Sequence, residues 1–112
     1  MAQLPAHYRM FKSKYPRLWQ AHNELSALCQ ETGPLNQKAR ELVKLGLSIG
    51  ARMEGAVHSH TRRALDAGVS AAEIRHAVLL GLTTVGFPST MAALTWVEDV
   101  LKKDRVRRIK RK

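Results

Sequence analysis

Two glutamates and three histidines between positions 41 and 76 are the side chains best suited to chemistry: Glu41, Glu54, His58, His60 and His76. Carboxylates and imidazoles exchange protons near neutral pH when their surroundings tune them, so this set favours general acid/base chemistry. The chain holds one cysteine, Cys29, and therefore neither an internal disulfide nor a cysteine-rich zinc site. What the five groups can do depends on which of them the fold brings together.

Helical spacing places His58 and His60 on different faces, because two residues correspond to about 200° of rotation. His58 shares its face with Glu54 and Arg62, which is typical of a histidine on a charged surface. His60 shares its face with Ala56 and Met53, which is typical of a hydrogen-bonded histidine beside a core. On spacing alone, neither histidine is more than a structural residue.

The five histidines do not follow a metal-binding pattern. Neither HxxxH nor HExxH occurs, and the pair in His58-Ser59-His60 can share a face on a strand but not on a regular helix. We therefore expect no metal site.

One longer spacing changes this interpretation. Glu41 is followed by eleven residues, Met53, two residues, Ala56, three residues and His60. This resembles the E-x11-C-x-x-C-x3-H pattern of the alkylhydroperoxidase D proteins, and the flanking segments RELVKL (40–45), HTRRALDAG (60–68) and GFP (86–88) resemble them too. Over roughly residues 16–101 the chain is identified as a short, single-domain member of the carboxymuconolactone decarboxylase superfamily.

The resemblance implies an all-α bundle of five to six helices that assembles as a trimer or hexamer and binds a small molecule. The thiol chemistry of the peroxidase branch is absent, because Met53 and Ala56 occupy the two cysteine positions. An antioxidant activity would have to use Cys29 with an external reductant, which stays an alternative.

The decarboxylase branch needs a proton acceptor and donor, and positive groups for substrate carboxylates, but no cofactor. Glu41 and His60 carry over from the pattern as candidate catalytic residues, with His58 as a weaker third. Gly55 and Ala56 stand where that branch has a histidine and a glutamate, so the rest of its site does not carry over. A non-enzymatic, oligomeric binding protein with a degenerate site is the other alternative. The candidate substrate-binding residues are Arg52, Arg62, Met53 and Ala56, and Arg63 is a further cation that could bind a carboxylate.

The remaining pattern predicts helices throughout. Pro16–Glu31 is the first strong helix, and Asn36 is a credible N-cap for the next. Further helices are predicted over 56–67, from the Ser70–Glu73 capping box onward, and from Ser89 to about Lys103. In the helix after Asn36 the predicted contact stripe is Ala39, Leu42, Val43, Gly46, Ile49, Gly50 and Met53.

Glu41 and His60 can share a site only if the helix is interrupted between them. On one straight helix the two would lie about 28 Å apart, so we expect a bend between Gly50 and Gly55.

The net charge of +10 is concentrated at one end. Residues 102–112 hold eight basic residues and one acidic residue, so we divide the chain into a helical domain, 1–101, and a basic tail, 102–112. We expect the tail to fray as a solvated end, with nucleic-acid contact as the less favoured alternative. No apolar run is long enough for a membrane span and no leader is apparent, so a cytoplasmic protein is expected.

Overall fold

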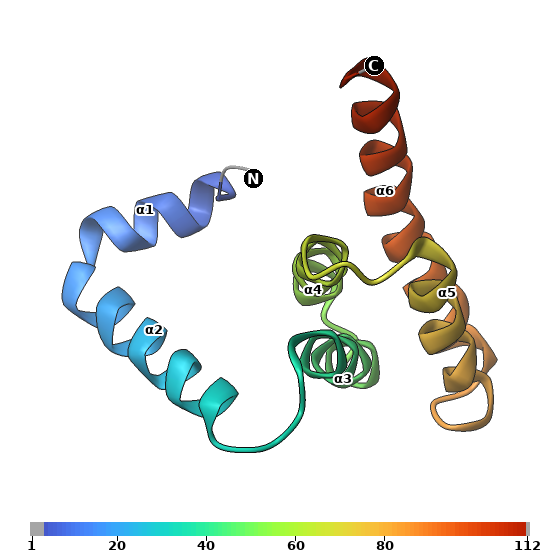
Figure 1. The fold of residues 1–112 in the computed structure, drawn as a ribbon, viewed down its shortest axis with the longest axis horizontal. Coiled ribbons are helices and arrows are strands. Elements are labelled where there is room, and N and C mark those ends of the chain that lie inside the picture. The colour runs from blue at the N-terminus through green and yellow to red at the C-terminus, as the bar shows by residue number, and fades with distance from the viewer. Residues whose placement is uncertain (1–3, 112) are drawn as a thin grey trace. The chain divides into compact units, whose positions relative to one another are not determined.

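The computed structural model describes residues 4–111, which are helical for most of their length and contain no strand. The predicted all-α class is thereby confirmed. The elements are α1 (Ala6–Lys14), α2 (Pro16–Glu31), α3 (Gln37–Gly50), α4 (Glu54–Asp66), α5 (Ala71–Leu79), a 3₁₀ helix η1 (Leu80–Thr83) and α6 (Phe87–Arg111) (Figure 1). The chain divides into two compact units, one ending at Leu35 and one beginning at Asn36, which are described separately.

The first unit consists of α1 and α2. Pro16 opens α2 at the bounds that the sequence predicts, whereas α1 was not predicted. Phe11 packs its ring against Tyr15 and Trp19, with centroid distances of 5.4 and 6.3 Å. None of the residues of α1 and α2 is buried, so this unit has no core of its own.

The second unit begins with a helical hairpin. The side chain of Asn36 accepts a hydrogen bond from the Ala39 N–H at 2.9 Å and caps α3, as predicted. Three residues separate α3 from α4, and Arg52 among them has a left-handed backbone with φ of +57°. A connection this short makes the two helices antiparallel neighbours. The break expected between Gly50 and Gly55 is confirmed.

Local signals also set the later boundaries. Gly68 has φ of +92° just beyond α4, a conformation that glycine adopts without strain. Ser70 and Glu73 form the predicted capping box at the start of α5, each hydrogen-bonding the other's backbone N–H. Gly86, with φ of +96°, ends the irregular stretch after η1, and α6 starts at the next residue.

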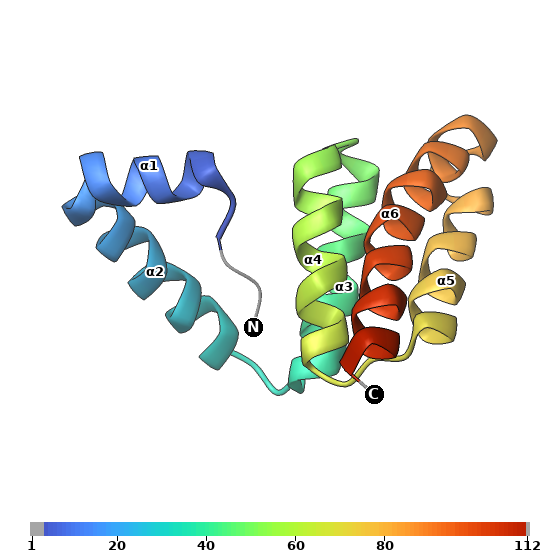
Figure 2. The same cartoon turned by 90° about the horizontal axis from the view of Figure 1, so that it is seen from above.

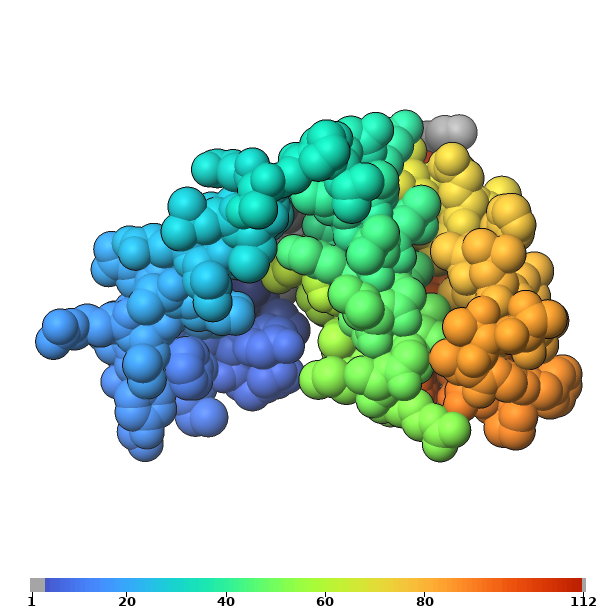
Figure 3. Space-filling model, turned by 90° about the horizontal axis from the view of Figure 1, so that it is seen from below, coloured from blue at the N-terminus to red at the C-terminus, as the bar shows by residue number. Residues whose placement is uncertain are grey.

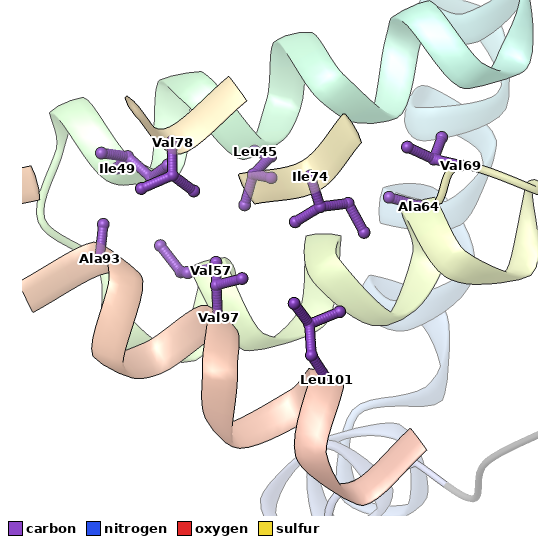
Figure 4. Close-up of a cluster of buried hydrophobic side chains, with 10 residues drawn as sticks. All are labelled: Leu45, Ile49, Val57, Ala64, Val69, Ile74, Val78, Ala93, Val97 and Leu101. Carbon is purple, nitrogen blue, oxygen red and sulfur yellow. The ribbon is translucent and has the colours of Figure 1, made fainter. Parts of the chain in front are cut away.

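Helices α3 to α6 lie alongside one another and enclose the core (Figure 2). Val57 and Ala64 of α4, Ile74 and Val78 of α5, and Val97 of α6 are fully buried. Figure 4 shows their side chains converging with those of Leu45, Ile49, Val69, Ala93 and Leu101. Burial of this apolar surface holds the four helices together.

The buried face of α3 differs from the predicted stripe. Its buried residues are Glu41, Leu45, Ser48 and Ile49, and the side with Val43, Gly46, Leu47 and Gly50 is exposed. In the space-filling view α3, teal to green, is open along its length (Figure 3). Ile49 of the predicted stripe lies in the core and Leu42 packs against it, but the glycines do not: a Cβ on Gly46 or Gly50 would have no neighbour within 4 Å.

Helix α6 continues to Arg111, well beyond the predicted end near Lys103, and fraying is not seen up to that residue. It crosses the predicted boundary between residues 101 and 102 without interruption. Among residues 4–111, no helix combines the length and the apolar character that a bilayer crossing requires.

Candidate functional site

The α3–α4 hairpin brings Glu41 and His60 together. Glu41 lies in the second turn of α3 and His60 near the middle of α4, and the reversal at residues 51–53 sets them side by side. The Nδ1 atom of His60 lies 3.2 Å from Oε1 of Glu41. Both side chains are largely buried, with 9% of the glutamate and 17% of the histidine exposed. The pairing that the sequence spacing suggested is therefore a direct contact.

The electrostatic setting makes Glu41 a carboxylate. Burial raises its pKa, but the hydrogen bond and charge of His60, together with the nearby Lys44 and Arg63, more than offset that effect and lower the pKa below the ordinary 4.5. An ionised carboxylate can only accept a hydrogen bond, so Nδ1 of His60 must donate. Nε2 of His60 makes no hydrogen bond within the described residues, and it is left to take up or deliver a proton.

His58 is not part of this pair. Its Nε2 atom is buried and lies 3.4 Å from Oδ2 of Asp99 on α6, in an orientation that forms no hydrogen bond. Since His58 and His60 are two residues apart on α4, one side chain is directed to α6 and the other to α3. Arg62 follows His58 by one helical turn and shares its side of α4.

Met53 and Ala56 lie on the same side of α4 as His60, since they precede it by seven and four residues. Met53 is 57% exposed at the N-cap of α4, and Ala56 is half-buried. These are the positions of the two thiols in the peroxidase pattern. Cys29, the one thiol present, is exposed on α2 in the first unit.

Two cations lie near the pair: Arg63 was already a candidate from the sequence, whereas Lys44 was missed. Lys44 and Arg63 both act electrostatically on Glu41. The signal was present in the spacing, because Lys44 follows Glu41 and Arg63 follows His60 by three residues each, which places each cation on its partner's side of the helix. Arg52 is exposed in the α3–α4 turn, and no interaction joins it or Arg62 to Glu41 in the described structure.

No group of three or more histidine, cysteine, aspartate or glutamate side chains in residues 4–111 is arranged to hold a metal ion. The α3–α4 hairpin offers a buried carboxylate that orients an imidazole, with two cations beside it.

Comparison with known proteins indicates the family of the chain. The sequence model of the carboxymuconolactone decarboxylase family matches residues 13–99. A nitrosuccinic acid decarboxylase of Metarhizium robertsii is 36% identical over 78 residues, which cover 66% of this chain and 54% of the relative, so the chain spans about half that protein's length. No solved structure matches. Because the matched range covers most of the chain, including the whole of α2, α3, α4 and α5, the chain belongs to the carboxymuconolactone decarboxylase family.

Proposed function

We propose that this chain is a decarboxylase-like lyase for a small carboxylic acid, with Glu41 and His60 as its proton-transfer pair. The single observation that carries the proposal is the 3.2 Å contact between a buried carboxylate and an imidazole on adjacent helices. Family membership and the name of the fungal relative give the same reaction class.

The reaction needs a proton at one carbon atom. When the bond between that carbon and the carboxylate breaks, CO2 leaves and the electron pair stays on the carbon, delocalised into a neighbouring electron-withdrawing group such as a carbonyl or nitro group. Protonated His60 then delivers the Nε2 proton to that carbon and regains one from water. Glu41 accepts from Nδ1 throughout, and so it holds the ring orientation and stabilises the imidazolium.

Substrate carboxylates would be held by positive charge around the pair. Lys44 and Arg63 are the cations that act on Glu41, and they are our first choice for this role. Arg52 and Arg62 remain further candidates from the sequence. Met53 and Ala56, on the same side of α4 as His60, would contact the ligand.

Self-association is part of the proposal, as a trimer or hexamer. Val43 and Leu47 on the outer side of α3 are 50% and 68% exposed, and Gly46 and Gly50 beside them add no side chain to that surface. An apolar helix face of this kind is stabilised when a second surface removes it from water.

The proposal is tested with 2-nitrosuccinate, the acid in the relative's name, followed by a panel of small 2-oxo and 3-oxo acids. CO2 release above the uncatalysed rate is measured for the wild type, Glu41→Gln, His60→Gln and His58→Gln. We expect the first two variants to lose about 10²- to 10⁴-fold in kcat, and His58→Gln to stay within about tenfold of wild type.

The same reaction carried out in D2O follows the proton that His60 delivers to carbon. Deuterium should appear at the carbon that lost CO2, because His60 exchanges its proton with solvent. Equal activity in wild type and His60→Gln would refute the assignment. A ligand that binds at the hairpin and is never turned over would favour the binding-protein alternative instead.

A further inference from the structure

The last three turns of α6 form an ordered basic helix. Residues 102–111 contain seven basic residues and one acidic residue, all within α6. The acidic residue, Asp104, is only 11% exposed and is bound by Arg107 and Arg108, each at 2.9 Å. The one negative charge of the segment is therefore turned toward the bundle and neutralised there.

Four cations cover the opposite side of this helix. Lys102, Lys103, Arg105 and Lys110 are exposed, and none of them lies within 4 Å of a carboxylate oxygen of the described residues; Arg105 acts on Glu98 only from a longer distance. At about 100° per residue, Arg105 lies on one flank, Lys103 and Lys110 lie on the other, and Lys102 lies between them. Figure 1 shows these last turns, in red, extending past the N-terminal end of α5.

We propose that this basic helix binds the phosphate backbone of B-form DNA without sequence preference. The major groove is about 12 Å wide and admits one α-helix, so cations on both flanks can reach phosphates of both strands. Lysine and arginine contacts to phosphate supply most of the affinity in sequence-independent binding. The inference concerns α6 alone and does not depend on the chemistry proposed for Glu41 and His60.

Duplex DNA fits better than the other anionic partners. Residues 102–111 hold no aromatic side chain, so base stacking with a single strand is not available. The deep, narrow major groove of duplex RNA excludes a helix. Val106 and Ile109 are the segment's only apolar side chains, and two are too few to insert a helix into a lipid surface.

The experiment measures fluorescence anisotropy of a labelled DNA duplex of about two helical turns, titrated with the full-length protein from about 50 to 200 mM salt. Four phosphate contacts predict a slope of log K against log salt of about −4. The test variant carries Lys102→Gln, Lys103→Gln, Arg105→Gln and Lys110→Gln, which leaves the Asp104 ion pairs intact. It should bind at least about tenfold more weakly at the lowest salt, with a slope near zero.

The matched control carries Lys12→Gln, Lys14→Gln, Arg17→Gln and Lys38→Gln, which removes the same charge from exposed positions outside α6. It should bind like the wild type. Circular dichroism checks that the test variant keeps its helices. If it does not, Lys103→Gln and Lys110→Gln are made singly, and each should flatten the slope by about 0.9.

Three results would overturn the proposal. The first is no binding of DNA at the lowest salt, and the second is an equal loss of affinity in the test and control variants. The third is binding to duplex RNA, or to vesicles of phosphatidylserine and phosphatidylcholine, that is as tight as binding to the DNA duplex.

Discussion

His60 reaches Glu41 at 3.2 Å across a reversal of only three residues, Ala51, Arg52 and Met53. The contact lies inside one helical hairpin, and both partners are mostly shielded from water. A buried carboxylate beside an imidazole is a coupled unit, so changes to one residue are felt by the other.

The first prediction concerns the stability of this pair. His60→Ala leaves Glu41 buried without its hydrogen-bond donor, so we expect the free energy of unfolding to fall by about 1–3 kcal/mol. Urea denaturation at neutral pH measures it. The double variant with Glu41→Gln should lose less stability than the sum of the two single variants. With glutamine at position 41, removing His60 no longer leaves a buried charge without its hydrogen-bond donor. Strict additivity would mean that the two side chains do not interact.

The second prediction concerns acid. The folded pKa of Glu41 is lowered from 4.5, so its ionised form is favoured by folding. That stability is present above pH 4.5 and is lost as the pH falls through the lower, folded pKa. Glu41→Gln should therefore lose less stability than the wild type between about pH 5 and pH 3. Glu73 and Glu98 also have lowered pKa values and keep both proteins acid-sensitive. Glu54→Gln, at an exposed position, is the control and should follow the wild type.

The third prediction concerns the outer face of α3. Leu47→Lys places a charge on the apolar surface proposed for self-association, and it should shift a trimer or hexamer to smaller species in size-exclusion chromatography with light scattering. Thr95→Lys adds the same charge at an exposed position on α6 and should leave the assembly unchanged. A monomeric wild type at micromolar concentration would contradict the proposed assembly.

The fourth prediction concerns the packing of η1 on α6. A Cβ on Gly81 would lie 3.0 Å from Oγ1 of Thr90 and 3.3 Å from Cγ2 of Val85. Both distances are shorter than an ordinary van der Waals contact, and Thr90 is fully buried and has little room to move. Gly81→Ala should lower the free energy of unfolding by about 1–3 kcal/mol. Gly55→Ala, where nothing lies within 4 Å, should raise it by about 0.5–1 kcal/mol, because alanine is the better helix former. Thermal unfolding of both variants compares the two effects.

The helix boundaries that are set by local capping residues were the easiest part of the fold to predict. Asn36, Gly68, and the Ser70 and Glu73 pair each act through hydrogen bonds or backbone conformation within a few residues, so their effects can be read locally. The pairing of Glu41 with His60 could also be predicted, because the residue spacing of the family pattern links the two positions. Helical periodicity alone does not link them.

Other features depended on the tertiary arrangement. The stripe predicted for α3 included glycines as contact residues. In the structure the neighbouring face of the helix, with Glu41 and Ser48, is buried instead. Both residues are polar, so a search for hydrophobic positions does not find them. The order of α6 beyond Lys103 was missed because eight basic residues suggest a frayed end. The inward placement of Asp104 becomes visible only when the helix is packed.

The hairpin has one more consequence, for the history of the sequence. The paired side chains are nineteen positions apart, and the reversal that brings them together lies between them. Insertions or deletions in α1, α2, α5 or α6 leave that interval unchanged. The pair can therefore be inherited as a unit while the surrounding helices are lengthened, shortened or exchanged.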